Sequence, residues 1–352
     1  MKVITKYISK QIISIFLLCN FIFILLYLLM DFILRIDNFV GAGVPLTLFF
    51  IYLIFRTPTM LVQVIIPAAT VISIIVVICQ MKKNKEIMAM KACGLNLHTA
   101  FQPVIIISII ISIFTLFLAE TVVPYTSTRS SEIWEIDVNK LPQASFQEFY
   151  KSEDNNIYWI KHFNIDTKTM NDPVFYFFDN QFNIKKIISG ETCRWLGEQW
   201  ELENARIVTL ENTTPTRPRY ILDIPETPET FINKLTQPED MTYAELKNRA
   251  KKAKAGGYDN TSDLVYLYMK LSYPFMAAVL ALIAIPIGLW EKTSGIPVSI
   301  TMGMLTIFLF MVSMGYARAF GRAGTLPPLL SAWTANILFT LLGIYLLMNI
   351  KK

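Results

Sequence analysis

Apolar residues in this chain gather in six long runs, separated by polar segments of very different lengths. A helix that crosses about 30 Å of hydrocarbon at 1.5 Å per residue needs about 20 apolar residues, and each run is long enough. The runs cover residues 12–34, 46–81, 100–123, 264–290, 296–320 and 327–350. The pattern therefore predicts an α-helical membrane protein with six transmembrane helices.

The polar region between the third and fourth runs has a different pattern. Short stretches rich in aromatic and β-branched residues alternate with turn residues, which predicts β-strands in a small sandwich or open barrel. These stretches are residues 157–160, 174–178, 184–188, 200–202, 207–210 and 220–224. We therefore expect an inserted β domain here.

A proline-rich linker, residues 215–238, follows the strands. Thr242 and Glu245 then form a capping-box pattern that predicts the start of a helix, which should end at Gly256-Gly257. We expect this helix to lie as an elbow at the membrane surface. The chain is therefore expected to divide into four parts: the first three spans with their connecting segment (1–124), the β domain with its linker (125–238), the elbow helix (239–262) and the last three spans (263–352).

The second apolar run is too long for one span. Arg56 and Pro58 are expected to divide it, so that 46–55 lies along the outer interface and 58–81 crosses. Pro67 should kink the crossing helix, since proline removes a backbone hydrogen bond.

The charged segment between the second and third runs is too polar to span a membrane. Ile87, Met90, Gly94 and Leu97 fall on one face at helical spacing, which predicts a short helix over 85–97. The pattern alone favours a connecting helix whose apolar face rests among lipid headgroups. The alternative is an element that receives a push from a soluble partner and passes it to the neighbouring spans.

Composition and charge set the orientation. The chain has 352 residues, 53% of them hydrophobic, and a net charge of +5. With a cytoplasmic N-terminus, the short inner segments contain ten lysines and two glutamates. Short basic loops stay inside, so we expect both termini in the cytoplasm and the β domain outside. The positive charge then reflects topology and not nucleic-acid binding.

Several cations lie near the predicted outer ends of the spans, and they are the candidate ligand-binding residues: Arg35, Arg56, Lys270, Arg318 and Arg322. Arg35 follows Asp31 by four residues, so the two can pair on one helix face. Lys270 lies six residues inside its span, about 9 Å deep at 1.5 Å per residue. It either extends back to the surface or meets an anion, and we weigh the two equally. Small residues around Arg318 and Arg322 should allow close helix packing.

Catalytic and metal-binding patterns are missing from the sequence. It has no phosphate-binding Gly-x-x-x-x-Gly-Lys-Ser/Thr loop and no Gly-x-Ser-x-Gly elbow, so it should not hydrolyse ATP itself. The two histidines have no companion ligands, and no metal site is expected. Cys193 is the one cysteine outside the membrane region, so no disulfide is expected within the β domain. Glu120 is expected to be an ordinary solvated carboxylate.

The chain resembles the LptF/LptG permeases of the lipopolysaccharide-export ABC transporter over nearly its whole length. The sharpest part is Glu86-Ile-Met-Ala-Met-Lys-Ala92-Cys-Gly94, which is similar to the family's connecting segment between the second and third spans. The supporting features, in chain order, are Pro58, Pro67, Gly197-Glu-Gln-Trp200-Glu-Leu, Tyr266-Leu-Tyr-Met-Lys270-Leu-Ser-Tyr-Pro274 and Gly321-Arg-Ala-Gly-Thr-Leu-Pro327-Pro328. Length and the compact C-terminus favour the LptG type, whereas Lys91-Ala-Cys-Gly-Leu favours the LptF type.

The resemblance implies a non-catalytic permease in the bacterial inner membrane, with a periplasmic β-jellyroll between spans three and four. Its implied partners are a second LptF/LptG-type permease, an LptB-type ATPase dimer that binds the ATP and magnesium, an LptC-type protein and lipopolysaccharide. The 85–97 segment would be the coupling helix on the ATPase, with contacts from Glu86, Ile87, Met90, Ala92, Gly94 and Leu97. The chain itself would need no cofactor.

Lipid A is anionic, so the outer cations would supply charge-assisted contacts to it. We expect Arg35, Lys270, Arg318 and Arg322 to do so, with Arg56 behind them. The first span departs from the family pattern, because Asp31 and Asp37 stand around Arg35 where family members often carry lysines.

Two other function classes are compatible with parts of the pattern. A membrane-anchored scaffold would recruit partners through the β domain, although six spans with several interfacial cations exceed what anchoring requires. A secondary transporter would usually show repeats and midplane ionisable groups, and neither is evident.

Overall fold

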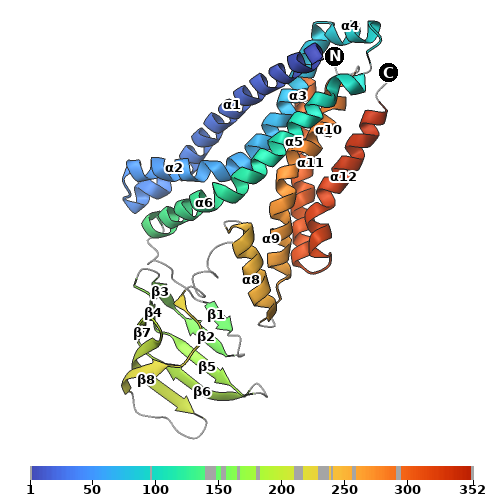
Figure 1. Ribbon diagram of the computed structural model, residues 1–352. Helices are drawn as coiled ribbons and strands as arrows, with labels where there is room; N and C mark the ends of the chain where they lie inside the picture. Colours follow the sequence, from blue (N-terminus) through green and yellow to red (C-terminus); the bar gives the residue numbers. More distant parts are fainter. Residues whose placement is uncertain are drawn as a thin grey trace.

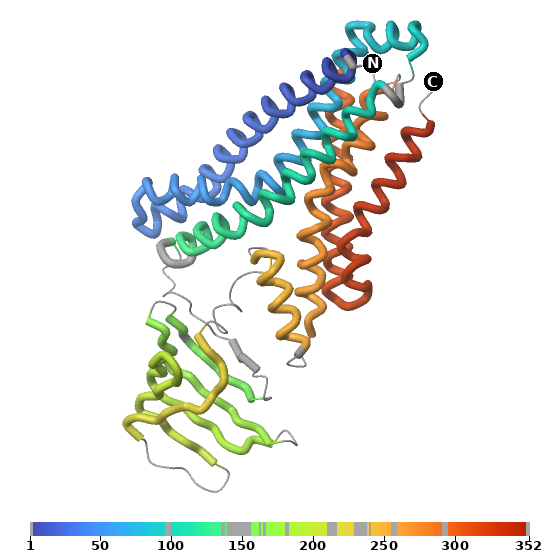
Figure 2. The backbone as a smooth tube through the Cα atoms, in the orientation of Figure 1, coloured from blue at the N-terminus to red at the C-terminus, as the bar shows by residue number. Residues whose placement is uncertain are grey.

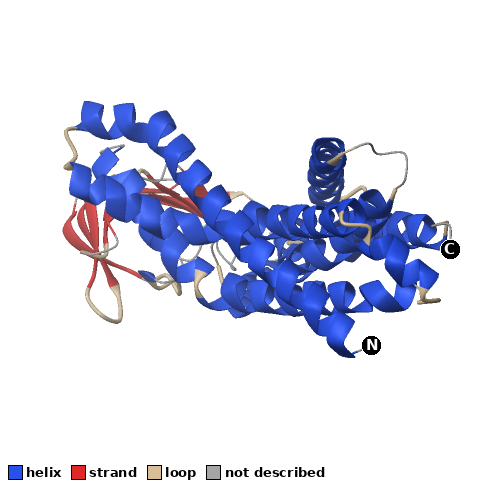
Figure 3. Cartoon of the chain, turned by 90° about the horizontal axis from the view of Figure 1, so that it is seen from above, coloured by secondary structure: helices blue, strands red, loops and turns tan. Residues whose placement is uncertain are grey.

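The computed structural model describes residues 2–95, 97–138, 148–151, 156–164, 167–179, 183–209, 217–228, 238, 241–255, 259–290 and 295–349. Within this part, the helices form a bundle and the strands form a separate β domain at one end of it (Figures 1 and 3). Figure 1 places both termini and the short helix α4 at one end of the bundle and the β domain at the other.

Six helical segments of the described chain are long and apolar enough to cross a membrane, as the sequence predicted. They are Val3–Ala42, Leu46–Lys83, Ala100–Thr121, Thr261–Leu289, Ile296–Arg322 and Pro328–Met348. The first helix, α1 (Lys2–Ala42), has 41 residues and extends beyond the predicted 12–34 run at both ends. At 1.5 Å per residue it is about 60 Å long, roughly twice the hydrocarbon thickness.

The second segment changes direction at a different place from the one predicted. Helix α2 (Leu46–Met60) runs unbroken through Arg56 and Pro58, and a π-helical turn, η1 (Leu61–Ile65), joins it to α3 (Ile66–Lys83). Figure 2 shows the chain turning between α2 and α3. The irregular turn comes just before Pro67, which has no N–H for the carbonyl of Gln63. The expected effect of Pro67 is therefore found, but the division at Arg56 and Pro58 is not.

The remaining helices complete the bundle around α3. They are α4 (Glu86–Ala92), α5 (Leu97–Thr121), α6 (Val123–Glu132), the π-helix η2 (Ile133–Val138), α8 (Tyr243–Ala255), α9 (Thr261–Ser272), the 3-10 turn η3 (Tyr273–Phe275), α10 (Met276–Leu289), α11 (Ile296–Arg322) and α12 (Pro328–Met348).

Helix α3 lies at the centre and packs against α1, α10 and α11. Small residues allow close approach to it: a Cβ atom on Gly303 of α11 would lie 2.5 Å from Ile75 Cδ1, and one on Gly288 of α10 would lie 2.9 Å from Ile78 Cβ. In contrast, α1 exposes large apolar side chains such as Leu18, Phe21 and Leu25. Exposed apolar faces of this kind suit contact with lipid or with another membrane helix.

The β domain, inserted between α6 and α8, forms one antiparallel sheet of nine strands in the described residues. They are β1 (Glu148–Lys151), β2 (Ile157–Ile160), β3 (His162–Asn164), β4 (Thr169–Asn171), β5 (Val174–Phe178), β6 (Ile184–Ser189), β7 (Thr192–Trp195), β8 (Trp200–Thr209) and β9 (Arg217–Leu222). The predicted β domain between spans three and four is thus confirmed.

One long hairpin organises the sheet. Strands β6 and β7 pair with β8 in a single continuous register, from Lys186 opposite Thr209 to Trp195 opposite Trp200. At Gly190, between β6 and β7, a Cβ would lie 2.6 Å from Leu202 Cγ, so only glycine fits against β8 there. Strands β5, β2 and β1 extend the sheet from β6, whereas β4 and β3 extend it from β7.

The strand predictions were right for the strongly apolar runs and missed the short ones. The runs at 200–202 and 207–210 belong to one strand, β8, whose described part ends at Thr209. Strands β1, β3, β4 and β7 were not predicted, because they have three or four residues each and little alternation. Trp200 is fully buried and its indole N–H donates to the Glu226 carbonyl at 2.7 Å.

Helix α8 starts at the predicted capping box. The Glu245 backbone N–H donates to Thr242 Oγ1 at 3.2 Å, and the Thr242 N–H donates to Glu245 Oε2 at 2.8 Å. An ion pair between Arg249 and Asp263 holds α8 against α9. The predicted end of this helix at Gly256-Gly257 lies outside the described residues. Part of the linker predicted over 215–238 is strand β9, and its residues 229–237 lie outside the described part of the chain.

Candidate functional site

A cavity opens between the helices at the end of the bundle nearer the β domain. Residues of α2, η1, α5, α6, α9, η3 and α11 line it, and most of the lining surface is apolar. Its volume is about 640 Å³, which includes space open to solvent. Its lining side chains with polar groups are Thr59, Gln63, Tyr266, Lys270, Tyr273 and Arg318. A largely apolar pocket with a few placed polar groups is typical of ligand sites.

A break in the fourth span shapes one wall of this cavity. Pro274 has no N–H for the carbonyl of Lys270, and the helix passes through the 3-10 turn η3 at this point. Beyond the break, the Ala278 N–H donates to Ser112 Oγ of α5 at 3.2 Å. Lys270, Tyr273 and Pro274 all line the cavity as a result.

Lys270 meets an anion of its own chain. Its Nζ lies 3.7 Å from Glu120 Oε2 of α5, and its side chain is only 13% exposed. The other carboxylate oxygen, Glu120 Oε1, accepts the Tyr243 backbone N–H at 2.7 Å. The expectation that Glu120 is simply solvated was therefore wrong, because the sequence pattern did not reveal that α8 and α9 would bring two positive groups to it.

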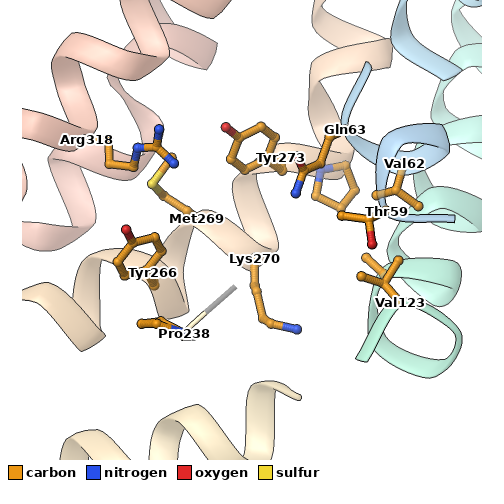
Figure 4. Close-up of a pocket in the computed structure, with 12 residues that line it drawn as sticks. Thr59, Val62, Gln63, Val123, Pro238, Tyr266, Met269, Lys270, Tyr273 and Arg318 are labelled. Atoms are coloured by element: carbon orange, nitrogen blue, oxygen red, sulfur yellow. The ribbon is translucent and has the colours of Figure 1, made fainter. Parts of the chain in front are cut away.

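The two arginines of α11 lie close to this wall. Arg318 lines the cavity, on the other side of Met269 from Lys270 (Figure 4). Arg322 lies one turn further along, and its Nη1 is 3.4 Å from the Tyr266 hydroxyl, with its guanidinium carbon 5.7 Å from the ring centroid. Tyr266 is itself a lining residue, so Arg322 borders the cavity through it.

Arg35 and Arg56 form a different cluster. Arg35 Nε donates to Asp31 Oδ1 at 2.8 Å, which confirms the predicted i, i+4 pair, and its guanidinium carbon lies 4.6 Å from the Trp134 ring centroid. Arg56 Nε is 3.8 Å from the other Asp31 oxygen. The cluster therefore holds two positive charges against one negative charge. Neither arginine lines the cavity, so the structure brings together Lys270, Arg318 and Arg322 but not all five predicted cations.

Sequence reasoning missed the polar lining residues Thr59 and Gln63. Gln63 was the easier to find, because it is a lone amide in an apolar run shortly before Pro67. Thr59 Oγ1 is buried with no hydrogen-bond partner among the described atoms.

The opposite end of the bundle carries α4, a helix of seven residues. It ends in a Schellman motif: the Gly94 N–H donates to the Lys91 carbonyl at 2.9 Å, and the Leu95 N–H donates to the Met90 carbonyl at 3.0 Å. Gly94 has φ +74°, which favours glycine. At the other end, Glu86 Oε1 accepts the Tyr7 hydroxyl at 3.3 Å, which ties α4 to α1.

The apolar face of α4 points into its own bundle. Ile87 and Met90 are each 8% exposed and belong to the main hydrophobic core. The exposed positions of α4 and its C-terminal turn are Met88, Ala89, Lys91, Ala92, Cys93 and Gly94, of which Met88 is 69% exposed. Of the expected contact residues, Ile87 and Met90 are thus covered by the helices of the same chain, whereas Ala92 and Gly94 are exposed. The side chain of Leu97 lies outside the described residues.

The family model for the lipopolysaccharide export system permease LptF/LptG matches residues 6–349. The chain belongs to the LptF/LptG family. No curated protein matches it. An LptF/LptG chain is a permease subunit of the lipopolysaccharide export system and not an enzyme, and its six spans make this one a multi-pass membrane protein. The match does not divide the LptF type from the LptG type.

Metal-ligating side chains are dispersed among the described residues of this permease. The part of the chain that the structure describes contains no cluster of three or more His, Cys, Asp or Glu side chains able to hold a metal ion. All four cysteines lie in that part and are free thiols. The side chains of His98 and His162 lie outside it.

Proposed function

We propose that this permease pairs with a second LptF/LptG-type chain over an LptB-type ATPase dimer in the bacterial inner membrane. ATP and magnesium would be bound by the ATPase. The two permeases would extract lipopolysaccharide from the membrane and pass it through the β domain to an LptC-type periplasmic protein. Both termini and α4 would then be cytoplasmic, and the β domain periplasmic.

One observation carries this proposal. A short helix with an exposed face lies at one end of the bundle, and a cation-bearing cavity lies at the other end, towards the β domain. The core connects the two, because Ile87 of α4 and Met269 of the cavity wall belong to one buried cluster. Motion of α4 could therefore reach the cavity through packed side chains.

We propose that the anionic groups of lipid A bind first to Lys270 and Arg318, with Arg322 at the border. Arg35 and Arg56 would act at the separate Asp31 cluster. Even with the open solvent included in its volume of about 640 Å³, the cavity is too small to enclose a lipid with several acyl chains, so the partner permease would complete it. For α4, we propose that Met88, Lys91 and Ala92 contact the ATPase, with Glu86 and Gly94 setting the helix position.

The test is co-expression with an LptB-type ATPase and candidate partner permeases, followed by purification from native membrane and mass spectrometry of bound proteins and lipids. We expect both proteins and lipopolysaccharide in the particle, and ATP hydrolysis that responds to lipopolysaccharide. Arg318→Ala should weaken that response several-fold, whereas Arg129→Ala, an exposed arginine of α6 outside the cavity, should not. A particle without an ATPase would overturn the proposal.

Removing residues 140–235 separates this function from a scaffold role. A permease core should still bind the ATPase without its β domain, although transfer of lipid onward should stop. If all partner binding disappears with the β domain while the helices stay in the membrane, the scaffold interpretation is favoured.

A further inference from the structure

We propose that Glu120 is a built-in counter-ion that an anionic lipid headgroup must displace from Lys270, and that this displacement releases α5 from α8 and α9. The inference rests on the proposed lipid-binding role of the cavity and deepens it. It assigns to Glu120 a positioning role that selects for charged headgroups.

The first step of the argument is the weakness of the present pair. Lys270 Nζ and Glu120 Oε2 are 3.7 Å apart, which is beyond hydrogen-bond distance. A phosphate oxygen bound by an ammonium group typically lies at about 2.7–2.9 Å, in a much stronger charge-assisted bond. Lys270 lines the cavity, and its side chain extends away from Arg318 on the side of Val123 (Figure 4). An anion that enters the cavity can therefore outcompete Glu120 for Lys270.

The second step is the other contact of the same carboxylate. Glu120 Oε1 accepts the N–H of Tyr243, the first residue of α8. Thr242 and Glu245 satisfy each other's N–H groups through the capping box. Glu120 thus has two positive partners, the Lys270 ammonium and the N-terminal end of a helix.

The third step is that these two partners move together. Helices α8 and α9 are joined by the ion pair between Arg249 and Asp263 and by a hydrogen bond from Asn260 Nδ2 to the Ala250 carbonyl at 3.1 Å. Leu246 of α8 also packs with Leu267 of α9. Glu120 therefore links α5 to the α8–α9 unit, and the cavity lies between them.

The consequence follows from charge. When a phosphate group takes Lys270, Glu120 loses one partner and faces a new negative charge, so its carboxylate is driven away from α8 and α9. A zwitterionic or neutral lipid offers no net charge to drive this step. Glu120 would therefore reject uncharged lipids and couple headgroup binding to separation of α5 from α8, a helix that follows the β domain in the chain.

The test uses Glu120→Gln, which keeps the size of the side chain and an oxygen for the Tyr243 N–H but removes the charge. In nanodiscs of phosphatidylcholine containing lipopolysaccharide, we expect the variant complex to bind lipopolysaccharide about tenfold more tightly than the unmodified complex. In a Lys270→Met background the same change should have no effect. Glu132→Gln, which removes a carboxylate of α6 outside the cavity, should behave like the unmodified complex.

The distance between α5 and α8 distinguishes the proposed role from a merely structural one, because a structural role of Glu120 would not make this distance depend on lipopolysaccharide. Spin labels at Phe117 of α5 and Lys247 of α8, both exposed, should move apart when lipopolysaccharide is added to a cysteine-free background. Glu120→Gln should reduce this separation, because its neutral amide keeps an oxygen for the Tyr243 N–H and is not repelled by a bound phosphate. An unchanged affinity and distance in a variant with unchanged thermal stability would overturn the inference.

Further measurements distinguish a lipid headgroup from a free anion, and the failure of this inference from the failure of the proposed function. An equal response to inorganic phosphate at matched concentration would mean a free anion, and would overturn the lipid assignment. If lipopolysaccharide stimulates ATP hydrolysis while Glu120→Gln changes neither affinity nor distance, the inference fails and the proposed function stands. If an anionic phospholipid separates the labels but no lipopolysaccharide is bound or extracted, the counter-ion role stands and the proposed function fails.

Discussion

Asn336 of α12 donates a hydrogen bond of 2.9 Å from its side-chain amide to the backbone carbonyl of Ser272, where α9 gives way to the 3-10 turn. In a continuous α-helix that carbonyl would accept the Met276 N–H, which here bonds Tyr273 instead. Both Asn336 and Ser272 are buried. A side chain of the last span therefore replaces the backbone bond that the break beside the cavity removes.

Replacing this amide should loosen the break. Asn336→Leu leaves the Ser272 carbonyl without its donor in an apolar setting, and we expect a loss of stability on the order of 1 kcal/mol. The thermal unfolding of the purified complex should shift downward, and lipopolysaccharide binding should weaken with it. Asn349→Leu is the matched control, because Asn349 is exposed and its side-chain amide donates to the Tyr345 carbonyl of the same helix. Equal shifts in the two variants would contradict the assigned role.

Gly321 should not tolerate a side chain. A Cβ atom there would lie 2.2 Å from Ser331 Oγ and 2.6 Å from Ser331 Cβ, so α11 and α12 would have to separate. We expect Gly321→Ala to destabilise the permease by about 1–3 kcal/mol, as overpacking does. Ser331→Gly should restore part of the stability in the double variant. Gly315→Ala of the same helix is the control, since a Cβ atom at Gly315 would have open space within 4 Å.

The outward face of α4 should carry the contact with the ATPase, and its inward face should carry stability. Met88→Glu alters a 69% exposed side chain, so the permease should remain folded while the ATPase no longer co-purifies with it. Ile87→Ala removes buried apolar surface and should lower the unfolding temperature while the remaining folded protein still binds the ATPase. Membrane abundance and ATPase content of each purified variant distinguish these outcomes. Full ATPase recovery with Met88→Glu would place the contact elsewhere.

Cys193 and Cys93 should differ sharply in reactivity. Burial raises the pKa of the Cys193 thiol, which is fully buried in the β domain, whereas Cys93 is exposed after α4. At pH 8, N-ethylmaleimide should label Cys93 rapidly and Cys193 only after unfolding, because the thiolate is the reactive form. Mass spectrometry of labelled peptides checks this. Fast labelling of Cys193 in the folded chain would contradict its burial.

The same shift has a consequence for stability. The pKa of the Cys193 thiol is higher in the folded chain than in the unfolded chain, where it is about 8.5. Burial of the neutral thiol therefore contributes fully to the free energy of unfolding below about pH 8.5, and this contribution is lost as the pH rises above that value. Cys193→Ala should therefore make the unfolding temperature less sensitive to pH on the alkaline side. The unfolding temperature of both forms between neutral and alkaline pH measures the difference.

The sequence predicted the features that depend on neighbouring residues in the chain. Span number follows from the length of each apolar run, and the strongest strands from their aromatic and β-branched residues. The start of α8 follows from Thr242 and Glu245, because a capping box needs only one turn of helix. The Asp31–Arg35 pair is equally local.

Tertiary structure decided which partner covers each face. Periodicity showed that Ile87 and Met90 share a face of α4, but not that this face packs into the permease and leaves Met88 outside. Lys270 and Glu120 are 150 residues apart, and only the packing of α5 against α9 makes them a pair. The same holds for Arg35 and Arg56, which the fold places with Asp31 and away from the cavity. Local sequence sets what a segment can form, whereas contacts between distant segments depend on how all the helices pack at once.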